Sequence, residues 1–332
     1  MTNSKTSVII TSISAPNSVM KSIAAESKKK NIDFIVIGDV KTPDDFNIDG
    51  CRYLSIKDQE NLNFRLAKSL PKKHYSRKNI GYLLAKNQDV IIETDDDNFP
   101  RTEFWNQRES SVLVNKINGS GWINVYKYFS ESNIWPRGFP LECLANTLPR
   151  VDENIQNVFC PIQQGLADEN PDVDAVYRMT QKLPFNFEKR TPVIIGKNSW
   201  CPFNSQNTTW FSEAFPLLYL PSYCSFRMTD IWRSFIAQRI AWTCGWPILF
   251  HNSTVWQERN EHNLLKDFED EVPGYLNNSK ICTFLENLDL KSGIENIDEN
   301  LLRCYKMMTE NNFIGRDEML LVEKWIHDLK LK

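Results

Sequence analysis

Three consecutive aspartates, Asp95, Asp96 and Asp97, follow the apolar run DVIIET at residues 89–94. Adjacent carboxylates repel one another, so they need water, a lysine or a metal ion as a partner. Mg²⁺ and Mn²⁺ prefer oxygen ligands and commonly link one or two carboxylates to the phosphates of a substrate. The pattern therefore favours a divalent cation on Asp95 and Asp97 that stabilises a leaving diphosphate, with a solvated turn as the alternative.

The spacing of other residues excludes several better-known sites. In an EF-hand counted from Asp95, the sixth position is Pro100 instead of glycine, and the twelfth is Asn106 instead of glutamate. No G-x-G-x-x-G fingerprint follows an expected strand. The eight cysteines and four histidines have no zinc-finger spacing, and we expect free thiols in a reducing cytosol.

The elements that would position these aspartates alternate between strand and helix. In the order strand, helix, strand, strand, helix, helix, strand, the expected elements are 7–13, 17–30, 33–38, 51–56, 58–69, 77–87 and 89–93. This order predicts an α/β fold with a mostly parallel sheet. Such sheets bind ligands at the carboxyl ends of their strands, so the same edge should also hold Thr11, Ser12, Asp39 and Lys41.

The rest of the chain is less regular. Prolines and glycine predict loops at 133–141 and 202–210, before a helix at 228–243 and a final strand at 246–250. From about residue 266 onward the pattern is helical and charged, ending in a helix at 317–330. We therefore expect two units, residues 1–265 with the sheet and a helical C-terminal extension, residues 266–332, packed on it.

Six blocks of sequence carry a wider pattern, at residues 35–56, 70–98, 132–142, 161–178, 202–209 and 228–240. In order, they resemble the STELLO family of glycosyltransferase-like proteins along nearly the whole chain. That family is related to the reversibly glycosylated polypeptides, which are UDP-arabinopyranose mutases and share the R-G-[FY]-P and P-D-x-D-A blocks. The resemblance implies a GT-A-like nucleotide-sugar-binding domain, and sugar transfer from a nucleotide diphosphate sugar, here expected to be a UDP-sugar, to an acceptor hydroxyl.

The resemblance also implies roles for acidic and histidine side chains. Asp95 and Asp97 match the D-x-D pair that binds Mn²⁺ or Mg²⁺ and the diphosphate, with Asp96 beside them. His251, after the expected last strand, sits where many GT-A enzymes place a third metal ligand; a structural histidine is the alternative. Asp230, at the start of a helix, matches the frequent catalytic base, although helix starts also favour aspartate as an N-cap.

Four further positions match family blocks. Arg77 and Lys78 are expected to contact the nucleotide or its phosphates, unless they form a solvated helix start. One of Asp172 and Asp174 is expected to face the sugar or acceptor, with an Asx-type turn as the alternative.

Arg137, in WPRGFPL, is expected to bind the donor, because a guanidinium is a poor nucleophile and a good clamp for a diphosphate. Its alternative is an ion pair that only shapes the site.

Three functions stay open at this point. The first is a metal-dependent glycosyltransferase for surface polysaccharide or glycan synthesis, with a glycan or lipid-linked saccharide as acceptor. The others are a UDP-sugar mutase and a non-catalytic scaffold of a polysaccharide-synthesising complex. The net charge of −3 argues against a nucleic-acid partner, and no apolar run could span a membrane. We therefore expect a cytoplasmic protein, and peripheral attachment to the inner face of the membrane stays open.

Overall fold

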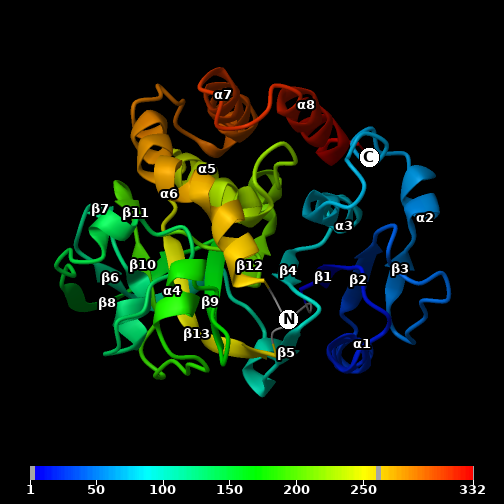
Figure 1. Cartoon of the computed structure of the whole chain (residues 1–332), viewed down its shortest axis with the longest axis horizontal. Helices are drawn as coiled ribbons and strands as arrows, with labels where there is room; N and C mark the ends of the chain where they lie inside the picture. The colour runs from blue at the N-terminus through cyan, green and yellow to red at the C-terminus, as the bar shows by residue number, and fades with distance from the viewer. Residues whose placement is uncertain (1–3, 259–262, 332) are drawn as a thin grey trace.

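The computed structural model describes residues 4–258 and 263–331. Within this range the main sheet has eleven strands, with ten in the order β3-β2-β1-β4-β12-β9-β13-β10-β6-β8 and β5 paired with β13 (Figure 1). The strands of the main sheet are β1 Thr6–Ser12, β2 Asp33–Gly38, β3 Arg52–Leu54, β4 Val90–Thr94, β5 Asn98–Pro100, β6 Ser111–Ile117, β8 Val151–Phe159, β9 Ile162–Asp168, β10 Val193–Ile195, β12 Asn207–Phe211 and β13 Ile248–Gln257. A second small sheet pairs β7 Gly121–Trp122 with β11 Ser199–Trp200.

The four strands β3, β2, β1 and β4 run parallel, and β12 enters antiparallel between β4 and β9. The register pairs Ser12 with Gly38 and Ile9 with Glu93, so the residues after β1, β2 and β4 meet at one edge. The predicted α/β fold class, with a helical C-terminal segment, is confirmed. The predicted boundary near residue 265 stays a prediction.

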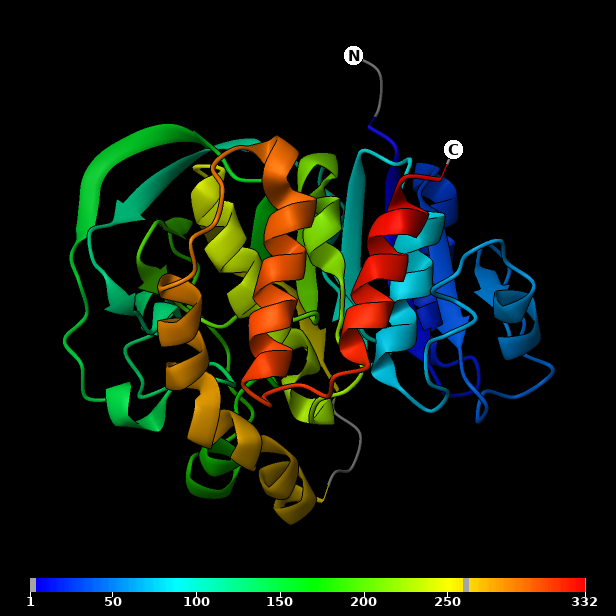
Figure 2. The same cartoon turned by 90° about the horizontal axis from the view of Figure 1, so that it is seen from above.

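Helices cover both faces of the sheet. They are α1 Ser18–Lys30, α2 Ile56–Glu60, α3 Lys78–Leu84, α4 Ala175–Thr180, α5 Thr229–Thr243, α6 Leu264–Glu286, α7 Ile297–Glu310 and α8 Glu318–Leu329. Helix α1 packs its buried residues on one face, and α3, α5, α7 and α8 contribute to the larger core on the other (Figures 1 and 2). Burial on both faces explains why β4 is an uninterrupted buried strand. None of the helices in the described residues is long and apolar enough to cross a membrane.

Three predicted elements were wrong or misplaced. The helix expected at 58–69 is the short α2, because a Ser55–Asp58 capping box starts it early and it ends at Glu60. The loop expected at 202–210 ends in strand β12, because Thr208, Thr209 and Trp210 favour a strand and pair with β4 and β9. The final strand does not end at residue 250 but runs from Ile248 to Gln257, held by β9 and β5.

Helix α8 is attached to the sheet domain by a buried carboxylate at each end. Near its start, Glu318 accepts hydrogen bonds from the backbone of Ser222 and Tyr223, at 2.9 and 2.7 Å, and from the Tyr219 hydroxyl. Near its end, Asp328 accepts one from the Leu66 backbone at 2.7 Å. Burial raises the pKa of Glu318 to about 7.

This shift predicts a pH-dependent stability. Between the ordinary glutamate pKa and pH 7, folded Glu318 keeps a proton that the unfolded chain releases, so its contribution to stability falls as pH rises. Glu318→Gln keeps an acceptor oxygen but does not titrate. From pH 5 to pH 8, the unfolding free energy of the wild type should fall relative to that of the variant by about 1–3 kcal/mol in urea titrations. A difference that stays constant with pH would contradict the assignment.

Candidate active site

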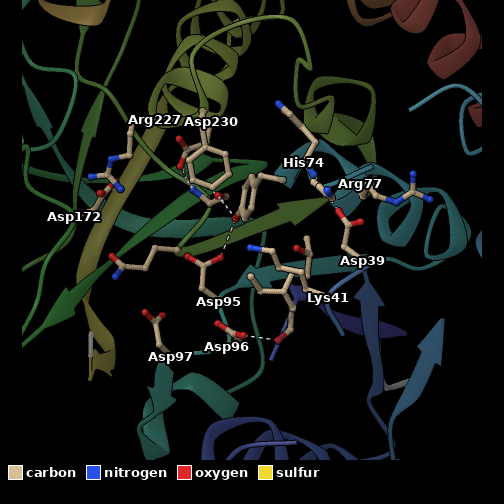
Figure 3. A pocket seen from close by; sticks show the side chains of 18 of the residues that line it. Asp39, Lys41, His74, Arg77, Asp95, Asp96, Asp97, Asp172, Arg227 and Asp230 are labelled. Carbon is tan, nitrogen blue, oxygen red and sulfur yellow. Dashed lines mark hydrogen bonds between the residues drawn. The ribbon is translucent and has the colours of Figure 1, made fainter. Parts of the chain in front are cut away.

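A cavity of about 420 Å³ lies at the carboxyl ends of β1, β2 and β4 (Figure 3). Its size is within the range of small-ligand sites. It is lined by most of the side chains predicted from the sequence: Thr11, Ser12, Asp39, Lys41, Arg77, Asp95, Asp96, Asp97, Arg137, Asp172 and Asp230. Three predicted residues, Lys78, Asp174 and His251, do not line it.

Each aspartate of the triplet has a different partner. Asp95 accepts from the Tyr75 hydroxyl at 2.8 Å and from Lys78 Nζ at 3.2 Å. Asp96, labelled in Figure 3, accepts from the Ser12 hydroxyl, and its backbone carbonyl accepts from Asn17 at 2.7 Å. Both carboxylate oxygens of Asp97 accept from Gln257 Nε2 at 3.0 Å. A cation thus compensates Asp95, whereas a hydroxyl and an amide hold the other two.

Lys78 lies behind the cavity instead of in it. Its side chain is fully buried, and its ammonium group also donates to the Tyr75 hydroxyl at 2.8 Å and to the Thr94 carbonyl at 2.7 Å. The lysine therefore ties the turn after β4 to the segment before α3 and sets the orientation of Asp95.

The electrostatics of the triplet fit a divalent cation. Burial, together with the charges of Asp95 and Asp96, raises the pKa of Asp97 to about 7. Burial also raises the pKa of Asp95, despite Lys78. Six carboxylates and six lysine or arginine side chains line the cavity. Their formal charges cancel, so the cavity has no net positive charge to offset a nucleotide diphosphate. Hard oxygen ligands on Asp95 and Asp97 could hold Mg²⁺ or Mn²⁺, which would supply that charge.

His251 is not brought to these aspartates. It lies within β13, six residues before Gln257, which corresponds to roughly 20 Å of strand. Its Nδ1 is 2.9 Å from the Asn252 carbonyl, and burial together with Arg108 lowers its pKa to about 3. In the part of the chain that the structure describes, no group of three or more His, Cys, Asp or Glu side chains could hold a metal ion. The fit to a cation therefore rests on Asp95, Asp97 and the phosphates of a ligand.

Arg137 joins the two acidic residues on the opposite wall. Its Nε and Nη2 donate to Asp172 at 2.7 and 2.9 Å, and Nη2 also reaches both oxygens of Asp230 at 2.9 and 3.0 Å. The remaining nitrogen, Nη1, donates to the Arg227 carbonyl. The ion-pair alternative weighed for Arg137 is therefore observed, and little of its guanidinium is left for a donor.

Asp230 is held as an anion by its neighbours. Although burial raises its pKa, the charges of Arg137 and Arg233 bring that pKa below the ordinary value. The Ser205 backbone and hydroxyl donate to it at 3.1 and 3.2 Å. It does not cap α5, whose N-cap is Met228.

Asp172 and Asp174 have different surroundings, and a contact of either one with a sugar or acceptor stays a prediction. Asp174 caps α4 by accepting from the Tyr177 backbone at 2.7 Å, and it also accepts from the Trp135 indole at 2.7 Å. Burial raises the pKa of Asp174 to about 6. Asp174 is therefore structural, and Asp172 is the one that lines the cavity.

Arg77 lines the cavity, but the hydrogen bonds of its side chain go to residues behind the cavity wall. Its Nε donates to the Gln59 side chain at 2.8 Å and Nη1 to the Leu70 carbonyl at 3.2 Å. Gln59 in turn donates to the Gly38 carbonyl at 2.8 Å, at the end of β2. The arginine therefore stabilises the strand end that precedes Asp39.

A buried ion pair fixes the strand and the helix that carry the acidic groups. Arg233, one turn after Asp230, donates to both oxygens of Glu93 at 2.8 and 2.9 Å, and Glu93 lies two residues before Asp95. The Trp210 indole also donates to Glu93 at 2.8 Å. This fully buried pair sets the position of α5 relative to β4.

Several residues of the cavity were not predicted. Tyr75 and Ser205, which hold Asp95 and Asp230, lie within sequence blocks already singled out, and their hydroxyls could have been considered. Gln257 gives no such signal, because only the extension of β13 brings it to Asp97. Phe226 is 56% exposed at the cavity and packs edge-on against the Tyr75 ring.

The comparisons with known proteins agree with the resemblance found in the sequence. A family described as STELLO glycosyltransferases matches residues 227–332. The chain is 28% identical to the probable glycosyltransferase STELLO2 of Arabidopsis thaliana over 335 residues, covering 91% of this chain and 42% of that protein. It is 26% identical to STELLO1 of the same plant, covering 97% and 44%. The chain thus spans less than half the length of these relatives, and the predicted resemblance is confirmed.

Solved structures give more distant matches. Glucosyl-3-phosphoglycerate synthase from Mycobacterium tuberculosis, in complex with Mn²⁺ and UDP-glucose, has a TM-score of 0.44 at 10% identity, covering 83% of this chain and 79% of that chain. GalNAc-T7 with UDP, GalNAc and Mn²⁺ has a TM-score of 0.35 at 13% identity, covering 95% and 57%.

Proposed function

Because the chain resembles the STELLO glycosyltransferases along nearly its whole length, we propose that it transfers a sugar from a nucleotide diphosphate sugar, a UDP-sugar, to an acceptor hydroxyl in glycan or polysaccharide synthesis. The observation that carries the proposal is the cavity at the carboxyl ends of β1, β2 and β4, with three individually held aspartates on its wall.

The donor is proposed to lie along this edge. Its nucleoside would contact the segments after β1 and β2, at Thr11, Ser12, Asp39 and Lys41, and its diphosphate would lie at the triplet. Asp95 and Asp97 would hold Mn²⁺ or Mg²⁺, which when bound neutralises charge on the leaving diphosphate.

The protein's own contribution is to keep the carboxylates in place before the donor arrives. Tyr75 and Lys78 both bind Oδ1 of Asp95, so Oδ2 remains for the ligand side. Gln257 holds Asp97 through both oxygens, and its amide adds no charge. Such preorganisation lowers the reorganisation that the transition state requires.

Asp230 has two candidate roles in this reaction. As an anion beside the cavity, it could accept the proton of the acceptor hydroxyl if the anomeric centre inverts. Its lowered pKa makes it a weak base, and its contacts with Arg137 suit a second role, in which it positions the guanidinium. Asp172, the other carboxylate on Arg137, provides a matched comparison.

A screen for ligand-induced stabilisation tests the proposed function. UDP, UDP-glucose, UDP-galactose, UDP-xylose and UDP-arabinose would be added with and without Mn²⁺, with GDP and ADP as controls. A ligand at 100 times its Kd stabilises the folded state by about 2.7 kcal/mol, which thermal denaturation detects. If no nucleotide raises the melting temperature, the transferase proposal fails and a non-catalytic scaffold is favoured.

The mutase alternative makes a separate prediction about Arg137, because the matching arginine block in the reversibly glycosylated polypeptides is associated with self-glycosylation. Its three nitrogens are bound to Asp172, Asp230 and the Arg227 carbonyl, so we expect no sugar to attach to it. Intact-mass spectrometry after incubation with each UDP-sugar should show no added pentose or hexose. An adduct that disappears in Arg137→Lys would favour the mutase. Arg137→Lys should also weaken UDP binding, because a lysine cannot bridge both carboxylates and the wall would loosen.

A further inference from the structure

A groove leaves the active-site cavity at Gln257. This residue borders both that cavity and a second one of about 550 Å³, which is also lined by Arg101, Glu169, Asn170, Trp256 and Glu258. Arg101 and Trp256 in turn border a third cavity of about 440 Å³ that reaches Lys189. The three cavities are therefore adjacent, and we call the second and third together the side groove.

The side groove follows directly from the strand that leaves the aspartates. Strand β5 begins at Asn98, directly after Asp97, and pairs antiparallel with the end of β13 (Figure 1). In this pair, Trp256 lies opposite Phe99. The two rings stack with their centroids 4.3 Å apart and their planes 8° apart. Phe99 thus supports one face of an indole that is only partly buried and that borders both cavities of the groove.

Arg101 adds a fixed polar group beside this indole. Its Nη2 donates to Asp168 at 2.9 Å, and the Ser253 hydroxyl and Phe187 backbone hold that carboxylate at 2.7 and 3.0 Å. Among the residues that the structure describes, the buried Nε of Arg101 has no hydrogen-bond partner, although the side chain as a whole is 37% exposed. This atom has no surface open to the groove, so a ligand oxygen there would meet the exposed part of the Arg101 side chain.

The charges of the groove select against polyanions. Arg101 is paired with Asp168, and Lys189 with Glu103 at 3.1 Å. Glu169 and Glu258 add two further carboxylates to the lining. A supported aromatic face flanked by hydrogen-bonding groups and carboxylates suits a ring with apolar C–H faces and neutral hydroxyls.

We propose that the side groove binds a neutral saccharide chain, and that this chain is the acceptor of the transfer reaction. The proposal rests on the proposed function and specifies its substrate class. The acceptor's reactive end would lie in the active-site cavity, near Asp97 and Asp230, and preceding sugar units would pass Gln257 to stack on Trp256. An acceptor that occupies the side groove in this way is a saccharide chain and not a single sugar or a small alcohol.

Affinity electrophoresis tests the proposal without requiring turnover. The protein would migrate through native gels that contain hydroxyethylcellulose, laminarin, galactomannan or, as the anionic probe, polygalacturonate. We expect at least one neutral polysaccharide to retard the wild type, and Trp256→Ala to raise its dissociation constant about tenfold or more, because truncating a central aromatic contact removes much of the binding energy.

Matched variants separate the outcomes. Trp105→Ala removes another partly buried indole, outside the three cavities, and should bind polysaccharide as the wild type does. Trp256→Phe keeps the ring stack and should bind with intermediate affinity if Trp256→Ala proves unstable. No retardation by any neutral polysaccharide, equal retardation of the wild type and the stable Trp256 variants, or preference for polygalacturonate would each overturn the proposal.

Calorimetry of UDP binding to the same proteins tests the proposed function separately. It therefore distinguishes failure of the saccharide groove from failure of the transferase proposal. Saccharide binding that depends on Trp256, without UDP binding in any of the proteins, would leave the groove valid and reject the transferase.

Discussion

Asp97→Ala is expected to remove the Mn²⁺ dependence of UDP binding. In the wild type, replacing Mn²⁺ with EDTA should weaken UDP binding about tenfold or more, a loss of about 1.4 kcal/mol or more. The reason is local charge: Asp97 is partly buried, lies beside two other aspartates and accepts hydrogen bonds from the Gln257 amide, which adds no charge. Titration calorimetry of both proteins, with Mn²⁺ and with EDTA, measures the effect directly.

The neighbouring carboxylate is the control for this experiment. Asp96 is bound by the Ser12 hydroxyl and is not assigned to the cation, so Asp96→Asn should keep the Mn²⁺ dependence. If the wild type binds UDP equally well in EDTA and in Mn²⁺, the metal assignment is wrong. Lys78 and the Tyr75 hydroxyl would then be sufficient partners for the Asp95 carboxylate.

Asp230→Asn is expected to lower kcat by roughly 10²–10⁴ if Asp230 accepts the acceptor's proton, with little change in UDP affinity. Asp172→Asn is the matched variant, because both carboxylates bind Arg137 and line the same cavity. In this case Asp172→Asn should keep a much larger share of kcat than Asp230→Asn. Kinetics with the UDP-sugar found in the screen, and with the polysaccharide that binds the groove, provide the comparison.

The positioning role gives a different result. If Asp230 only holds Arg137, the two variants should lose similar activity, and the double variant should lose little more, since both act through one guanidinium. The acidic limb of the pH profile of kcat should then remain in Asp230→Asn. A folded Asp230→Asn variant with normal turnover would exclude both roles.

The sequence predicts the edge of the sheet well because that information is local. Apolar runs mark β1, β2 and β4, and the polar residues immediately after them, such as Ser12, Asp39 and Asp95, must meet where parallel strands end. The resemblance added Arg137 and Asp230, which local patterns would not have connected, since they are 93 residues apart.

What could not be predicted depends on long-range pairing. The packing of distant loops decides which aspartate binds Arg137. It places Asp172 against the guanidinium and Asp174 against the Trp135 indole. The expected strand end before His251 was wrong for a related reason. Its polar neighbours Asn252 and Ser253 suggest a strand end, but pairing with β9 and β5 extends β13 to Gln257.

The double hydrogen bond from Gln257 to Asp97 connects the two ends of the proposed reaction. Gln257 borders the side groove as well as the active-site cavity, and Asp97 precedes the strand that supports the Trp256 indole. A ligand in the active-site cavity that shifts this hydrogen bond changes the free energy with which a second ligand binds the side groove, and the reverse also holds. By thermodynamic linkage, any factor by which UDP tightens saccharide binding must equal the factor by which the saccharide tightens UDP binding. The cooperativity between donor and acceptor can therefore be measured from either side, with UDP as the titrant or the sugar chain.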